Sequence, residues 1–244
     1  MGLDAKLRLA RTLVIIDTRH DDIAAFVSAL FDAGADVIQL RDPDASLAVV
    51  GTAVVTAQQI AMPRNKLVAV TGDLVLAKAV MADVLVGGPA LDPGLAHARM
   101  HEYALVGAPV FDPASCYSVA SDHNVNFALV GPVYLPESSP VAAPGLDLVR
   151  AAAGAMPAGD ASGTPWFAIG GLTPDRIGEV IEAGARRAGI VVSGDSGLAS
   201  VTAISIALHQ AWDADPDLRD FAFRVLTNES PAGGVRRFSE PTPW

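Results

Sequence analysis

Short apolar runs recur along the chain and alternate with longer stretches in which apolar and polar residues are mixed. Most of these runs are apolar almost throughout, which is typical of strands buried on both faces of a parallel sheet. The intervening stretches have the length and composition of helices, so each strand is predicted to be followed by a helical crossover. The strands are expected at residues 13–17, 37–41, 67–71, 84–86, 105–108, 127–130, 166–169 and 190–192.

Eight strand–helix units are the number that closes a (β/α)₈ barrel, so the sequence predicts an α/β fold of the TIM-barrel type. The 244 residues match the usual size of one such barrel, and a hydrophobic content of 51% suffices for a single large core. The helix-to-strand joint also repeats, because Phe-Asp-Ala-Gly-Ala-Asp at 31–36 resembles Ile-Glu-Ala-Gly-Ala-Arg at 181–186, and 81–83 occupies the same kind of joint. We expect one barrel domain over residues 1–212 and a C-terminal extension over 213–244, with a further helix around 221–226 and a mobile end from 228 onward.

Glycines follow the last two predicted strands. Gly170 and Gly171 come directly after residues 166–169, and Ser193 and Gly194 come after 190–192. Glycine turns leave backbone N–H groups uncovered, and the loops after strands seven and eight of a TIM barrel frequently use such groups to bind phosphate. The alternative is that these glycines only form tight turns. Because two copies follow adjacent strands, we favour a phosphate site.

A helix is predicted directly after the first glycine pair. Thr173 is a suitable N-cap, and Pro174 suits the first helical position, where its missing N–H costs nothing. The helix is expected to extend to Ala183 and to end at Gly184.

Polar residues at other strand ends are candidates for the mouth of the barrel. Gln39 and Arg41 lie two apart in one strand and therefore face the same side, where Arg41 could bind an anion. The alternative for Arg41 is an internal ion pair with Asp17 or Asp42. The proline-rich loop 135–145 after the sixth strand is either a lid or a passive insertion.

The charge balance excludes some partners. A formal net charge of −10 disfavours nucleic acid and anionic membranes as partners, so an anionic ligand needs a local site.

The apolar run at 13–16 is too short for a signal peptide or a membrane span. The single cysteine, Cys116, excludes an internal disulfide and fits a reducing cytoplasm. His97 and His101 could share a metal, but a solvated helix face is the preferred interpretation.

Several segments together resemble the thiamine phosphate synthase family and the related thiazole tautomerases. The resemblance extends from residue 13 to about residue 210 and is most specific from 143 to 192. It implies a single TIM barrel that joins an aminopyrimidine pyrophosphate to a thiazole phosphate with Mg²⁺, where the pyrophosphate leaves before the thiazole nitrogen attacks. The matching segments are Gln-Leu-Arg at 39–41, Gly-Pro at 131–132, Ala-Pro-Gly-Leu at 143–146 and Phe-Ala-Ile-Gly-Gly-Leu-Thr-Pro-Asp-Arg at 167–176.

The resemblance implies that the thiazole-phosphate half of the site is retained. Gly170 and Gly171 match the family's glycine pair, and Val192 and Ser193 match the rim of the eighth strand. Gln39 and Arg41 match a Gln-x-Arg segment that binds the pyrimidine and pyrophosphate. We therefore expect phosphate binding by Gly170, Gly171, Val192, Ser193 and Gly194.

The chain departs from the family pattern in the other half of the site. The lysine expected two residues after Arg41 is Pro43, and the expected metal aspartates are displaced by one residue to Asp73 and Asp92. The histidine expected of a tautomerase is Pro132. The serine after the fifth strand and the Thr-x-Thr-Lys segment are replaced by proline at 109 and by Pro-Glu-Ser-Ser at 136–139, and the only lysines, Lys6, Lys66 and Lys78, cannot be placed at the mouth.

Three interpretations follow. The one we favour is a family member that binds a thiazole-phosphate-type ligand and has an impaired or lost ligation reaction. The second is an active thiamine phosphate synthase in which Arg41 and Asp73 are catalytic and Asp73 and Asp92 hold Mg²⁺, the only case that requires the metal. The third is another phosphate-handling TIM-barrel isomerase or epimerase. All three predict a small-molecule phosphate ligand and are compatible with a homo-oligomer.

Overall fold

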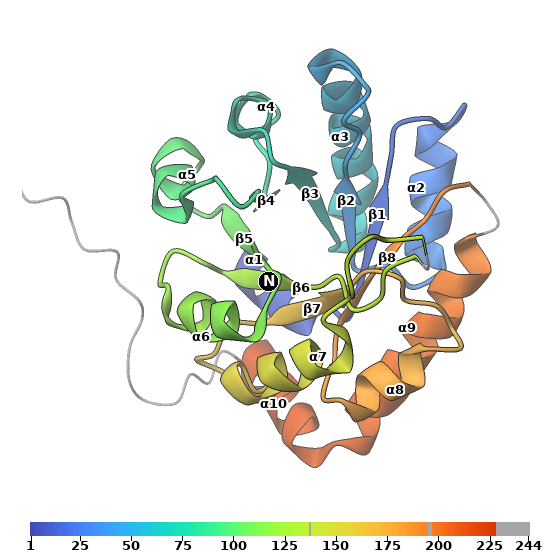
Figure 1. Ribbon diagram of the computed structural model, residues 1–244. Helices are drawn as coiled ribbons and strands as arrows, with labels where there is room; N and C mark the ends of the chain where they lie inside the picture. Colours follow the sequence, from blue (N-terminus) through green and yellow to red (C-terminus); the bar gives the residue numbers. More distant parts are fainter. Residues whose placement is uncertain (137, 195–196, 228–244) are drawn as a thin grey trace, which may run out of the picture.

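The structure, a computed structural model, describes residues 1–136, 138–194 and 197–227. Eight parallel strands close into a barrel in chain order (Figure 1), and the last strand pairs with the first through Thr12 and Ala188. The α/β class and the (β/α)₈ barrel expected from the sequence are confirmed. The strands are β1 (Thr12–Ile16), β2 (Val37–Leu40), β3 (Leu67–Thr71), β4 (Val84–Val86), β5 (Leu105–Val110), β6 (Phe127–Val130), β7 (Trp166–Ile169) and β8 (Ala188–Val191).

Helices connect the strands and surround the barrel in Figure 1. Several begin at an aspartate or serine whose side chain accepts a hydrogen bond from the first turn, so the sequence itself marks where they start. The helices are α1 (Leu3–Leu9), α2 (Ile23–Asp32), α3 (Leu47–Ala61), the 3₁₀ turn η1 (Met62–Arg64), α4 (Leu74–Ala79), α5 (Pro93–Arg99), α6 (Pro113–Ser121), α7 (Gly145–Ala155), α8 (Ile177–Glu182), α9 (Leu198–Ala214) and α10 (Pro216–Thr227).

Alternating strand residues build two cores. One face of each strand points into the barrel, where Leu13, Val37, Phe127 and Phe167 belong to one buried cluster. The other face packs against the helices and forms a larger second cluster. Because the strands are buried on both sides, their sequences are apolar almost throughout, as the pattern predicts.

Helix α1 closes the barrel at the end where the strands begin. Leu7 of α1 and Ala10, directly after it, are buried in the interior cluster with Leu13 and Leu67, and α1 lies behind the strands in Figure 1. This helix is not among the elements expected from the sequence. The apolar residues Leu3, Leu7 and Ala10, which recur at helical spacing and pack in this cluster, are the signal that could have predicted it.

The helix after the seventh strand begins later than expected. Thr173 does not cap it with its side chain, because α8 starts at Ile177 and residues 173–176 form a turn. The backbone carbonyl of Thr173 accepts from the N–H groups of both Arg176 and Ile177, at 3.0 and 3.1 Å. The prediction at Thr173 and Pro174 is therefore wrong, whereas the predicted end at Ala183 and Gly184 is right.

Some strand and helix limits also differ. The eighth strand begins at Ala188, two residues before the predicted start, because the glycine at 189 pairs with β1 despite its weak strand propensity. The fifth strand extends to Val110 through Pro109. His101 lies beyond the end of α5 at Arg99, so it does not share a helix with His97.

The repeated joint has the same geometry in all three copies. Gly34 and Gly184 have positive φ angles of 107° and 110°, and Met81 at the third joint has a φ of 51°. The residue after each of them donates its N–H to a carbonyl five residues earlier, as in Ala82 to Ala77 at 2.8 Å. Each joint is a helix C-terminus closed by a left-handed residue.

The C-terminal extension continues the fold as a helix. Helix α10 packs Leu218 and Phe221 against Trp212 of α9, and it lies next to α1. The predicted mobile end from residue 228 lies outside the described residues. Among the helices that the structure describes, none has the length and apolar character needed to span a membrane.

Candidate functional site

The glycine pair after β7 presents uncommitted backbone donors at the mouth of the barrel. Gly170 and Gly171 have φ angles of 94° and 64°, and none of the described residues accepts a hydrogen bond from their N–H groups. A Cβ at Gly170 would lie 2.6 Å from Pro132, and one at Gly171 would lie 2.7 Å from the Cβ of Tyr134. Both positions require glycine for space as well as for backbone conformation.

The turn after β8 lies beside the glycine pair because β7 and β8 are adjacent strands. Ser193 is exposed and Gly194 has a φ of 74°, and their N–H groups also have no acceptor in the described part of the chain. Val192 differs, because its N–H donates to the carbonyl of Ile15 at 2.9 Å and its side chain is buried in the outer core. Of the five residues expected to bind phosphate, four have a backbone N–H without an acceptor among the described residues.

Tyr134 holds the loop after β6 against the turn after β7. Its hydroxyl donates to Glu179 of α8, and the guanidinium carbon of Arg176 lies 4.7 Å from the centre of its ring. Arg176 also donates to the carbonyl of Gly171 at 3.4 Å. Burial and the bond to Glu179 raise the pKa of Tyr134 to about 12. No local sequence signal indicates this contact, since residues 134 and 179 lie far apart in the chain.

Gln39 lies in β2, whereas Arg41 follows the last residue of that strand, so the predicted placement of both residues in one strand is wrong for Arg41, and the two have different environments. Gln39 is 2% exposed and donates to the hydroxyl of Thr71 on β3 at 2.8 Å. Its Oε1 is buried without a partner among the described residues, which leaves one acceptor for a ligand inside the mouth. Arg41 is exposed, and its side chain contacts no acid in the part of the chain that the structure describes.

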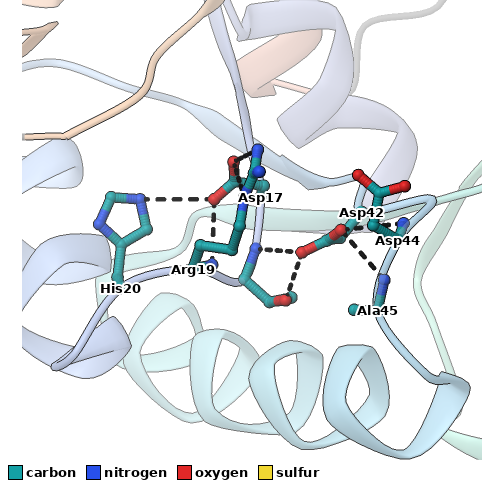
Figure 2. A network of polar contacts seen from close by, with 7 residues as sticks. Asp17, Arg19, His20, Asp42, Asp44 and Ala45 are labelled. Carbon is teal, nitrogen blue, oxygen red and sulfur yellow. Dashed lines mark hydrogen bonds and ion pairs between the residues drawn. The ribbon is translucent and has the colours of Figure 1, made fainter.

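The two acids that could have neutralised Arg41 are engaged elsewhere (Figure 2). Asp17 accepts from Nη2 of Arg19 at 2.6 Å, and His20 Nε2 lies 3.9 Å from its other oxygen. Asp42 accepts from the hydroxyl of Thr18 at 2.6 Å and from the backbone N–H groups of residues 44 and 45. These contacts are compatible with Arg41 as an anion-binding side chain and not with an internal ion pair between Arg41 and either acid.

These contacts change the acidity of both carboxyl groups. The hydroxyl and N–H of Thr18 hold the pKa of Asp42 below its usual value. For Asp17, burial would raise the pKa, but the hydrogen bonds from Arg19 outweigh it and lower the pKa. Both side chains therefore stay ionised at neutral pH and act as fixed acceptors, and the bonds from Thr18 to Asp42 connect the ends of β1 and β2.

Asp73 and Asp92 do not form a metal site as arranged. Each caps a helix, Asp73 by accepting from Leu76 N–H and Asp92 from Leu95 N–H, both at 2.7 Å. No group of three or more His, Cys, Asp or Glu side chains that could hold a metal occurs among the described residues. The set that Mg²⁺ prefers, several oxygens around one point, is not present at these positions.

The floor of the mouth is apolar and partly open. Val191 on β8 is 67% exposed, and Ile15 and Ile169, whose side chains face the barrel interior, are half-buried. Lysines do not contribute to this surface. Lys6 lies in α1 and Lys78 in α4, and Lys66 pairs with Asp36 at 2.6 Å at the opposite end of the barrel.

A closed parallel barrel whose mouth carries uncommitted N–H groups after β7 and β8 has the arrangement of phosphate-binding (β/α)₈ proteins. Over residues 12–193 the chain matches the profile of the thiamine monophosphate synthase family. The chain belongs to this family.

Individual relatives agree with this assignment. A thiamine-phosphate synthase of Saccharopolyspora erythraea is 35% identical over 199 residues, which cover 78% of this chain and 87% of the relative. One of Acidothermus cellulolyticus is 34% identical over 193 residues, covering 78% and 89%. The solved thiamine phosphate pyrophosphorylase of Pyrococcus furiosus has a similar fold, with a TM-score of 0.70, 21% identity, and coverage of 86% of this chain and 99% of that one.

Proposed function

We propose that this chain binds a thiazole-phosphate-type ligand in thiamine biosynthesis and that its ligation reaction is impaired or lost. The observation that carries the proposal is the set of four backbone N–H groups, of Gly170, Gly171, Ser193 and Gly194, that have no acceptor among the described residues. They lie at the ends of two paired strands and can donate together to the oxygens of one phosphate group. The apolar floor at Val191 suits the ring that carries the phosphate.

The proposed loss of ligation follows from the charges at the other side of the mouth. Release of pyrophosphate places several negative charges there, and stabilising them requires preorganised cations. Arg41 is an uncommitted cation at this position, whereas Arg19 is bound to Asp17. Since Asp73 and Asp92 do not fit a Mg²⁺ site in this arrangement, we derive no step that uses the metal.

An active thiamine phosphate synthase is the alternative, and the curated relatives at 34–35% identity favour it. In that case Arg41 would bind the pyrophosphate, and Asp73 and Asp92, whose Oδ1 atoms cap two helices, would have to bring their other oxygens to one Mg²⁺. The third interpretation, an isomerase or epimerase, needs a free base at the mouth. Asp17 and Asp42 are both engaged as acceptors, which argues against it.

Binding is tested by the melting temperature in the presence of thiazole phosphate or inorganic phosphate. We expect thiazole phosphate to raise it, and we expect Gly171→Asp to abolish this effect by placing a charged side chain where the N–H must meet the ligand. Gly178→Asp is the matched control, because a Cβ at this exposed position on α8 meets nothing within 4 Å. Absence of a shift in the unsubstituted protein would refute the binding claim.

Ligation is tested by supplying both substrates with Mg²⁺ and assaying thiamine phosphate. No turnover together with retained thiazole phosphate binding would support the proposal. Turnover that Asp73→Asn removes would establish the synthase instead, since asparagine still caps α4 but no longer carries the charge.

We further propose a cytoplasmic location for the chain. The single cysteine, Cys116, is buried and unpaired, as expected in a reducing compartment.

A further inference from the structure

Two arginines meet at the closed end of the barrel, opposite the mouth. Thr12 at the start of β1 pairs with Ala188 at the start of β8, so the preceding residues, Arg11 and Arg187, are neighbours. Their guanidinium carbons lie 4.7 and 5.0 Å from the ring centre of Trp212. Arg187 is 2% exposed, whereas Arg11 is half-buried and gives the pair access to solvent.

Two polar atoms in this place have no hydrogen-bond partner in the described part of the chain. They are Nε of Arg11 and Nε of Arg187, and both are buried. The Nη2 of Arg187 donates to the backbone carbonyl of Arg8 at 2.8 Å. Guanidinium groups can only donate, so the missing partner must be an acceptor.

The nearby acids do not neutralise Arg187. Asp36 accepts from Lys66 and from the backbone N–H groups of residues 11 and 12, and Asp4 binds Arg8. Asp36 and Asp213 act on Arg11, but the charges that act on Arg187 are those of Arg8 and Arg11. Burial and this repulsion lower the pKa of Arg187 to about 9. A buried cation without a counterion is costly, so the structure favours an added negative charge at this position.

We propose that Arg11 and Arg187, here called the basal donor cluster, bind a small tetrahedral oxyanion such as inorganic phosphate. The oxygens of such an ion accept hydrogen bonds from several directions at once, which matches two guanidinium groups. Because the cluster lies at the opposite end of the barrel, it is separate from the phosphate site proposed at Gly171 and does not depend on it.

The experiment uses the Gly171→Asp protein, in which the mouth is blocked, and follows its melting temperature against inorganic phosphate at constant ionic strength. If this crowded position prevents folding, Gly194→Asp takes its place as the parent, because a Cβ there meets nothing within 4 Å. We expect a saturable rise that sodium chloride does not reproduce. Arg187→Met in the same background should remove the rise or weaken phosphate binding by about tenfold or more, because it deletes a charge-assisted donor. Arg150→Met is the control, since Arg150 is exposed on α7 and paired with Asp147.

A second variant keeps the test valid if Arg187→Met does not fold. Arg11→Met removes the other guanidinium, on a half-buried side chain, and should also weaken phosphate binding. The proposal is overturned if the Gly171→Asp protein shows no phosphate-dependent rise, if chloride gives the same rise, or if Arg11→Met and Arg187→Met retain the affinity of their parent. If instead the phosphate site proposed at Gly171 does not exist, the result is different: phosphate then raises the melting temperatures of the unsubstituted and Gly171→Asp proteins equally.

Discussion

Asp17 accepts two hydrogen bonds from Arg19, one from Nε at 2.9 Å and one from Nη2 at 2.6 Å. This pair commits the carboxylate at the end of β1 to a residue of its own loop. Asp42 at the end of β2 is committed in the same way to Thr18 and to backbone N–H groups. Neither acid pairs with Arg41, so its guanidinium has no acidic partner among the described residues and is left for a ligand.

Arg41→Gln should weaken binding of inorganic pyrophosphate by about tenfold or more, because it removes a charge-assisted donor. The free energy of unfolding should change little, since the side chain has no acid partner among the described residues. Titration calorimetry measures the first quantity and urea denaturation the second. Arg99→Gln, at the exposed end of α5, is the control and should leave binding unchanged.

Thr18→Val should destabilise the fold in a pH-dependent manner. The Thr18 hydroxyl lowers the pKa of Asp42 in the folded state. Its contribution to the free energy of unfolding is therefore present above the pKa of Asp42 in the unfolded chain, about 4, and is lost as pH falls through the pKa of Asp42 in the folded protein. The difference in unfolding free energy between the two proteins should be constant from pH 5 to 7 and shrink below about pH 4. Urea denaturation across this range measures it. Thr52→Val on α3, whose hydroxyl donates only to Ala48, should show no such dependence.

Met81→Gly should stabilise the protein by about 1 kcal/mol, because a left-handed φ strains residues other than glycine. The side chain is 64% exposed, so its removal sacrifices little packing. The free energy of unfolding from urea denaturation measures the effect. Met62→Gly provides the contrast, since Met62 is also exposed but has a helical φ of −55°, and there glycine should destabilise.

Tyr134→Phe should weaken phosphate binding several-fold by releasing the loop after β6 from Glu179. The pKa of about 12 means that the hydroxyl stays protonated, so the loss should be equal at pH 6 and pH 9. Phosphate titrations at both pH values measure it. Tyr117→Phe, on the exposed surface of α6, should have no effect, and an equal loss there would argue against a specific role for Tyr134.

The barrel could be predicted from the sequence because each strand and each joint is marked by residues that lie close together in the chain. Eight apolar runs became eight strands, and the repeated Ala-Gly-Ala joint became a left-handed glycine at both Gly34 and Gly184. The beginning of α8 was misplaced because a backbone carbonyl, and not the Thr173 side chain, closes the first turn. The preference of threonine for N-cap positions does not show whether its side chain or its backbone carbonyl will accept the hydrogen bonds.

The site was only partly accessible from sequence. Gly170 and Arg41 could be placed at the mouth because each follows a strand, but the partners of Asp17 and Asp42 depend on how two loops meet. The same limit applies to Arg187, whose neighbours come from residues 8, 11 and 212. Asp73 and Asp92 illustrate a competing signal, since an aspartate before a helix is also a preferred N-cap.

The exposed Val191 has a thermodynamic consequence for ligand binding. Its side chain is left in contact with water at the floor of the mouth, although it belongs to a strand. A flat heterocycle resting on it would exclude that water, so association should proceed with a negative change in heat capacity. Inorganic phosphate, which has no ring, should bind at the same amides with a much smaller change.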